Sequence, residues 1–367
     1  MKRGIPWIHS AGVDGAFILA PPYLILALVM LFPQWFGPRA ELTELHWLVL
    51  VLCIDVAHVY STIYRTYLDR EAVRHYRFEL VWLPLIAFVV LVIMYSVDAL
   101  WFWRCMAYMA IFHFVRQQYG FMRLYARRDE VPTWKHRLDA ITIYSATLMP
   151  LLFWHFSYPR SFDWFVEGDM VGADAPVLAA SVMVAYGVIL VLYLASEVRM
   201  ALQKTFNVPK NVLLCGTALG WYLGIVHYDG DVTFTLFNVV GHGVPYMALV
   251  WAFGRKKRSA LSEAGGNRSR VHAFFSMRAI PFYLLLLFVL AYVEEGFWNS
   301  LVWDEHDGIF KPFKALPVVS GHVLLSFLVP LLALPQVTHY IIDAFIWRMR
   351  KDRDRWQAVV FGQEMDR

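Results

Sequence analysis

Cysteine is scarce in this sequence of 367 residues. Only Cys53, Cys105 and Cys215 occur, each inside an apolar run, and none belongs to a CxxC motif. Isolated cysteines in apolar runs behave as small hydrophobic side chains. The sequence therefore excludes a fold held together by several disulfides and a metal centre built from thiolates.

Charge is also scarce. Charged residues make up 17% of the chain and the formal net charge is only +4, whereas soluble domains are about one quarter charged. No basic tract is interleaved with aromatic residues in the way that nucleic-acid binding requires. We therefore expect no nucleic-acid partner.

Long apolar runs are abundant. Hydrophobic residues make up 59% of the sequence and the mean hydropathy is +0.48. A helix of roughly 20 apolar residues crosses the hydrocarbon core of a bilayer. We predict an all-α, polytopic integral membrane helical bundle of about ten transmembrane helices, at residues 15–36, 44–66, 78–97, 99–122, 138–157, 175–198, 211–228, 232–254, 278–298 and 316–348.

The loops between these runs alternate in charge. Arginine and lysine follow every even-numbered run, as at 255–258, and acidic residues occupy the other loops, as at 304–307. Because positive loops mark the cytosolic side, both termini are expected in the cytosol. The chain is interpreted as a single membrane domain, 1–367, with a cytosolic linker at 255–276 and a cytosolic tail at 349–367. The expected location is multi-pass in a bacterial inner membrane.

Four histidines lie inside predicted spans that all run toward the cytosol: His58, His113, His242 and His339. Each precedes the cytosolic arginine of its helix by 7 to 13 positions, which is roughly 10–20 Å at 1.5 Å per residue. The four imidazoles are therefore expected at a similar depth, where they can converge. Ionisable residues at such depth indicate a functional site by default.

Each of these histidines has an oxygen-bearing neighbour three or four residues away, which places the two on one helix face. The neighbours are Asp55, Gln117, Asn238 and Asp343. Such residues act as additional ligands or orient a ligating imidazole. Imidazole with carboxylate or amide oxygen suits iron, zinc, copper or nickel, so Fe(II) is the first choice, with zinc and an axial haem pair as alternatives. The opposing interpretation makes the histidines helix–helix hydrogen-bonding residues.

Other polar residues carry weaker signals. Arg116 lies one turn from His113 and is a candidate for ion pairing or for binding an anionic group, as are Tyr119 and Tyr246 for substrate contacts. His227, Asp229 and Asp231 in the HYDGD segment suggest a solvated loop more than a second metal or proton site.

The segment PQVTHYIIDAFIWR, with His339, Asp343 and Arg348, resembles the C-terminal signature of the Brp/Blh-type membrane oxygenases that cleave β-carotene to retinal. Phe112-His113-Phe114 and the Asp55/His58 pair resemble two earlier family elements. Tyr246 stands where that family has a second histidine four residues after the first. The resemblance implies one iron bound by membrane histidines.

Together these features favour a membrane oxidoreductase, specifically an iron-dependent oxygenase or dioxygenase of lipid metabolism. Its partners would be the bilayer and a lipophilic small molecule such as a carotenoid or other lipid. The alternative is a transporter or channel that uses the same residues as a His/Asp proton relay or substrate site.

Overall fold

The computed structural model describes residues 7–37, 40, 42–263 and 270–348. The predicted cytosolic tail, 349–367, lies outside the described residues. Within the described ranges the chain is helical and forms no strand, apart from an isolated bridge between Ser157 and Asp174. This confirms the predicted all-α fold.

The chain divides into two compact units. Unit 1 contains Met1–Glu41 and Ala107–His242, and unit 2 contains Leu42–Met106 and Gly243–Arg367. The boundaries fall inside two helices, so α7 (Ala99–Tyr125) and α12 (Gly241–Glu263) each supply residues to both units. The predicted single membrane domain stays a prediction.

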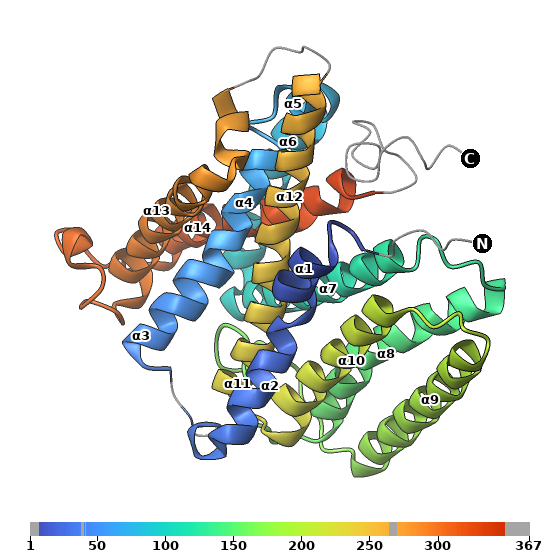
Figure 1. The fold of residues 1–367 in the computed structure, drawn as a ribbon. Coiled ribbons are helices and arrows are strands. Elements are labelled where there is room, and N and C mark those ends of the chain that lie inside the picture. The colour runs from blue at the N-terminus through green and yellow to red at the C-terminus, as the bar shows by residue number, and fades with distance from the viewer. Residues whose placement is uncertain (1–6, 38–39, 41, 264–269, 349–367) are drawn as a thin grey trace. The chain divides into compact units, whose positions relative to one another are not determined.

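Unit 1 is organised around α8, which packs against both α9 and α10 (Figure 1). Helix α2 packs against α10 and η5. Besides its part of α7, this unit contains α1 (Ala11–Asp14), η1 (Gly15–Leu19), α2 (Pro21–Leu31), η2 (Pro33–Trp35), α8 (Thr133–Phe156), α9 (Pro176–Leu202), α10 (Val208–Trp221), η4 (Tyr222–His227), α11 (Asp231–Thr235) and η5 (Leu236–Val240).

Unit 2 is built around α14, which packs against α6 and α4, while α13 packs against α4 and η3. Besides most of α12, this unit contains α3 (Glu44–Trp47), η3 (Leu48–Val56), α4 (Ala57–Arg65), α5 (Arg70–His75), α6 (Arg77–Val97), η6 (Arg270–Phe275), η7 (Met277–Ala279), α13 (Ile280–Trp298), η8 (Asn299–Trp303), η9 (Lys311–Phe313) and α14 (His322–Ile346). The predicted linker thus includes the end of α12 and η6, with residues 264–269 outside the described ranges.

Side-chain caps and prolines set several helix starts. Asp69 accepts hydrogen bonds from the first turn of α5, and Asn207 accepts one from the Lys210 amide at the start of α10. Both satisfy backbone donors that a helix start leaves without intrahelical partners. Helix α14 continues through Pro330 and Pro335 as one element.

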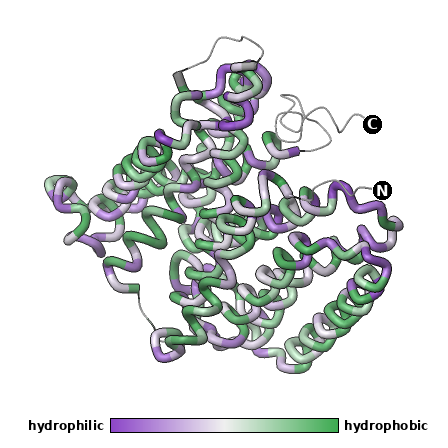
Figure 2. Tube along the Cα trace, viewed as in Figure 1, coloured by the Kyte–Doolittle hydropathy of each residue, from purple (hydrophilic) through white to green (hydrophobic). Residues whose placement is uncertain are grey.

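Six helical segments among the described residues are long and apolar enough to cross a membrane, and a bent pair, Ala11–Leu19 with Pro21–Leu31, would make a seventh. Figure 2 shows hydrophobic residues along the length of α9, one of the six. The six are Glu44–Arg65, Arg77–Val97, Pro176–Leu202, Asp231–Ser262, Met277–Trp303 and His322–Ile346. The chain is therefore a multi-pass membrane protein by length and composition, and the figure of about ten spans stays a prediction.

Candidate metal centre

Two of the four histidines form a pair in unit 1. His113 of α7 and His242 of α12 have ring centroids 4.9 Å apart and are 7% and 1% exposed. The Phe114 ring lies 3.9 Å from the His242 ring and covers one of its faces. An apolar ring therefore packs directly against His242.

Amide side chains of α7 tie that helix to the start of α12. Gln117 donates to the His242 carbonyl at 3.2 Å, and Gln118 donates to the Gly241 carbonyl at 3.3 Å. Asn238 donates to the Phe234 carbonyl at 3.0 Å. Gln117 and Asn238, which were predicted beside the metal, thus have described bonds to backbone oxygen. The Gln117 bond holds α7 against the start of α12, and the predicted role of both amides beside a metal stays a prediction.

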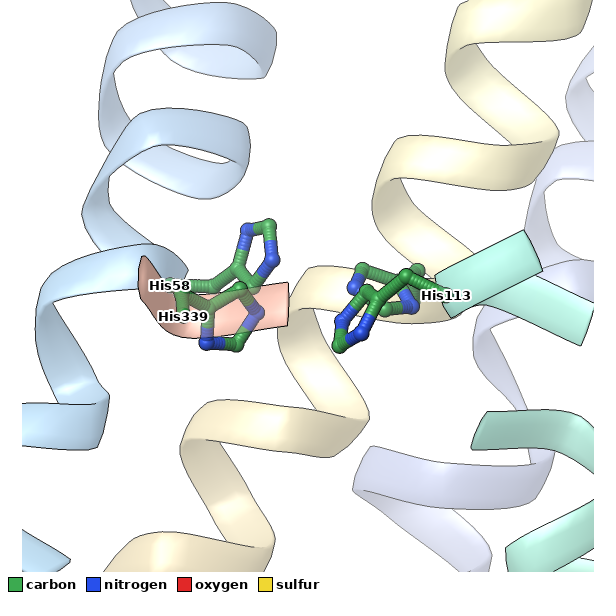
Figure 3. A group of neighbouring side chains, drawn as sticks. His58, His113 and His339 are labelled. Carbon is green, nitrogen blue, oxygen red and sulfur yellow. The ribbon is translucent and has the colours of Figure 1, made fainter. Parts of the chain in front are cut away.

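The other two histidines form a pair in unit 2. His58 of α4 and His339 of α14 have ring centroids 5.0 Å apart, and each is 1% exposed. Figure 3 shows these two imidazoles next to each other, and it also shows His113 on α7. The Tyr246 ring of α12 lies edge-on to both, at 5.9 Å from His58 and 5.0 Å from His339.

A chain of hydrogen bonds orients His339. Tyr246 donates its hydroxyl proton to Asp343 at 2.5 Å, so its oxygen accepts from Thr62 at 2.9 Å. The Thr62 hydroxyl has then given its only proton, and it accepts from His339 Nδ1 at 2.7 Å. In this order of donors the His339 proton lies on Nδ1, and the Nε2 lone pair is available as a ligand.

The two predicted carboxylates lie beside their histidines. Asp55 Oδ1 is 3.7 Å from His58 Nδ1, and Asp343 Oδ1 is 3.8 Å from His339 Nδ1. Both distances exceed a hydrogen bond. Asp343 therefore acts on His339 through Tyr246 and Thr62. Thr62 was missed by the sequence interpretation, although it lies four residues after His58 and so on the same helix face.

A glycine permits the close packing of α12 near His58. A Cβ built on Gly243 would lie 2.8 Å from Ile54 Cγ2 and 3.0 Å from the Ile54 carbonyl oxygen. The same Cβ would lie 3.5 Å from His58 Cβ. Only a residue without a side chain fits here without displacement of its neighbours.

The four buried histidines each offer a nitrogen atom, and these four nitrogens all lie within 4.8 Å of one another. Two nitrogens on opposite sides of one ion are about 4.2 Å apart, because a metal–nitrogen bond is about 2.1 Å. The spacing is therefore close to that of a single coordination sphere. Neutral imidazole is a ligand for iron, zinc, copper and nickel, so this group could bind a metal.

The remaining predicted residues have structural contacts. Arg116 donates to the Tyr144 hydroxyl at 2.5 Å and lies over the Tyr119 ring at 5.1 Å. It has no ion pair with any carboxylate in the part of the chain that the structure describes.

The HYDGD segment was predicted to be a solvated loop, but its residue Asp229 is buried. This carboxylate is 9% exposed, accepts from the Ser161 amide at 3.1 Å and lies 3.5 Å from Arg160. Burial raises the pKa of Asp229, while Ser161 and Arg160 oppose that shift. Its contacts are those of a buried ion pair that ties two loops of unit 1 together.

Comparison of the chain with protein-family models, with curated proteins and with solved structures gave no match. The functional interpretation therefore depends on the histidine group and its surroundings.

Proposed function

We propose that this protein is a membrane-embedded, histidine-ligated metal oxidoreductase, and that His58, His113, His242 and His339 hold one ion. The supporting observation is the spacing of the four buried nitrogens, within 4.8 Å. An ion held by four imidazoles would still have room in its coordination sphere for a small molecule. Non-haem iron is the preferred metal, with zinc as the alternative.

The spacing argues against haem. An axial pair needs two histidines on opposite faces of a porphyrin with clear space around the ring. Here two further imidazoles lie within the same 4.8 Å limit, where a porphyrin would collide with them. A single ion fits the donor set better.

Iron bound at such a site would supply the activation of dioxygen for oxidation of a substrate. The protein's own residues supply orientation and exclude water. Thr62 and Tyr246 hold the His339 tautomer, and Phe114 covers the His242 ring. Because the histidines are buried in a membrane protein, we propose a lipophilic substrate such as a carotenoid or other lipid. The resemblance to Brp/Blh-type oxygenases agrees with this choice.

Metal analysis of protein purified in detergent tests the proposal. We expect about one metal ion per chain by elemental mass spectrometry, and a large loss of metal from each of His58→Ala, His113→Ala, His242→Ala and His339→Ala. The exposed histidines His46 and His322 serve as controls, because alanine there should leave the metal content unchanged. Metal content that survives alanine at two or more of the four positions would refute the proposal.

Metal content alone does not establish an oxidoreductase. If the protein is an oxidoreductase, the purified protein should consume dioxygen when it is supplied with reduced iron and an extract of membrane lipids. Oxygen consumption that requires all four histidines would support it. A zinc protein would consume no oxygen under the same conditions.

The second candidate function is a transporter that uses these residues as a proton relay. The chain from His339 through Thr62 and Tyr246 to Asp343 favours it, because hydrogen-bonded hydroxyls and carboxylates conduct protons in membrane proteins. This hypothesis predicts that the purified protein contains no metal and transports protons across the membrane of vesicles. It also predicts that Tyr246→Phe abolishes this proton transport.

A further inference from the structure

One face of the last turns of α12 carries polar residues. Arg255 lies three residues before Arg258 and four before Ser259, and Ser262 lies four after Arg258, so these residues lie along one side of the helix. They line a cavity of about 300 Å³ together with Phe275, Ser276 and Met277 from the segment before α13. All of these residues belong to unit 2.

The basic residues of this segment differ in their partners. Lys257, on another face of the helix, is buried and ion-paired with Asp69 at 2.8 Å and Glu71 at 2.7 Å. No carboxylate of the described side chains pairs with Arg255 or Arg258. The Arg255 guanidinium contacts Met277 Sδ and the Trp251 ring. Lys257 thus has a structural role. The side chains of Arg255 and Arg258, which line the cavity, have no acidic partner among the described residues.

The chemistry of the cavity matches a phosphate. Guanidinium groups bind phosphate oxygens through paired N–H donors, and serine hydroxyls add further donors. Among the side chains that the structure describes, none that lines the cavity is acidic.

An apolar surface begins directly beyond this cavity. Helix α13 starts at Ile280, just after Met277, and carries the exposed side chains Phe282, Leu285, Val289 and Val293 at spacings of three and four residues. Such a stripe suits the acyl chains of a lipid whose head group occupies the cavity. Basic pockets at the cytosolic ends of membrane helices bind anionic head groups in this way.

We propose that this cavity binds the phosphate of an anionic membrane phospholipid, with Arg255 and Arg258 as its main cationic contacts. The proposal is independent of the metal centre. It requires that the end of α12 lies at a membrane surface, as its basic residues indicate.

The test uses the full-length protein in detergent, with unfolding temperature as the readout. Short-chain phosphatidylglycerol should raise the unfolding temperature in a saturable way, and short-chain phosphatidylcholine and inorganic phosphate should not. In R255Q/R258Q the apparent affinity for phosphatidylglycerol should fall about tenfold or more. R199Q/K204Q removes the same charge from exposed positions at the end of α9 and should change this affinity less than twofold.

R255K/R258K keeps the charge but removes the guanidinium forks, so an intermediate affinity is expected. If R255Q/R258Q is unstable without lipid, the affinity of R255K/R258K is compared with that of R199Q/K204Q instead. Equal losses in R255Q/R258Q and R199Q/K204Q would overturn the proposal, because attraction by overall charge would then be sufficient. An equal effect of phosphatidylcholine or of inorganic phosphate would overturn it as well.

Discussion

At the scale of single residues, a substitution at Thr62 tests the tautomer of His339. Thr62→Val removes the hydroxyl that accepts from His339 Nδ1 and keeps the volume of the side chain. Partners that orient a ligating histidine commonly change metal affinity about 10–100-fold. We expect a loss of this size in a competition titration with a chelator.

Thr66→Val is the matched control for this change. The Thr66 hydroxyl donates to the Thr62 carbonyl and reaches no histidine in the described contacts. Its loss should therefore leave metal affinity within about twofold. Equal effects of the two variants would mean that Thr62 acts on the packing of α4 and not on His339.

The sequence predicts the four histidines because the distance of each from an arginine at the end of its predicted span is visible in the chain. It does not show which histidines pair, because the His58–His339 and His113–His242 contacts join helices far apart in sequence. Thr62 carries only a weak signal, since a hydroxyl in a helix most often bonds to its own backbone. Gln117 and Asn238 lie at helical spacing from a histidine, and yet their described bonds are to backbone carbonyl oxygens. Helical spacing alone therefore does not predict a bond to an imidazole.

At the scale of helices, alanine at the two glycines that flank His242 should have opposite effects on stability. Gly243→Ala places a Cβ 2.8 Å from Ile54 Cγ2, so either α12 or η3 must shift near His58. Overpacking of this kind costs about 1–3 kcal/mol. We expect a lower unfolding temperature and a lower metal content.

Gly241→Ala is the control, because its Cβ would meet only Pro22 Cγ, at 3.7 Å. That distance is an ordinary van der Waals contact, and alanine favours the helix over glycine by up to about 1 kcal/mol. Stability should therefore be unchanged or slightly increased. A Gly243→Ala variant as stable as Gly241→Ala would contradict the close packing of α12 on η3.

Helices α8, α9 and α10 are joined by buried ion pairs. Lys210 contacts Asp139 at 3.1 Å and Glu197 at 3.2 Å, and Lys135 pairs with the same two carboxylates. Asp139→Asn leaves a surplus of buried positive charge, and breaking a buried pair costs about 3–5 kcal/mol. We expect a large drop in unfolding temperature, whereas Asp174→Asn at an exposed position should have almost no effect.

This ion cluster explains why the charge pattern of the sequence is only partly informative. Lys135 and Lys210 follow the fourth and sixth predicted spans and so belong to the basic residues from which the topology was predicted, yet they are 0% and 2% exposed. Their spacing from Asp139 and Glu197 in sequence gives no sign of the contacts between α8, α9 and α10. Charges that are paired in the interior therefore weaken any topology derived from basic residues alone.

At the scale of the whole molecule, metal removal should lower stability. A ligand that binds only the folded state stabilises it by about 2.7 kcal/mol at a hundredfold excess over Kd. Treatment with a chelator should therefore reduce the unfolding temperature of the unaltered protein. The same treatment should have no effect on a His58→Ala/His242→Ala variant. A chelator effect that persists in this variant would place the metal elsewhere.

The topology provides the last prediction. Six or seven segments of the described ranges meet the length and composition required of a span, while the sequence pattern predicts about ten. The difference includes α8, whose 24 residues extend about 36 Å and suffice to cross the bilayer. Its charged residues Lys135 and Asp139 are paired, which lowers the cost of placing them at the membrane.

Cysteine labelling decides whether α8 crosses. In a background without the three natural cysteines, Glu130→Cys and Glu167→Cys place exposed thiols before and after α8. If α8 spans the membrane, an impermeant maleimide added to sealed vesicles should label only one of them, and permeabilisation should expose the other. Labelling of both from the same side would contradict the crossing of α8. The alternation of loop charges would then reflect internal ion pairs such as Lys135–Asp139 and not the orientation of ten spans.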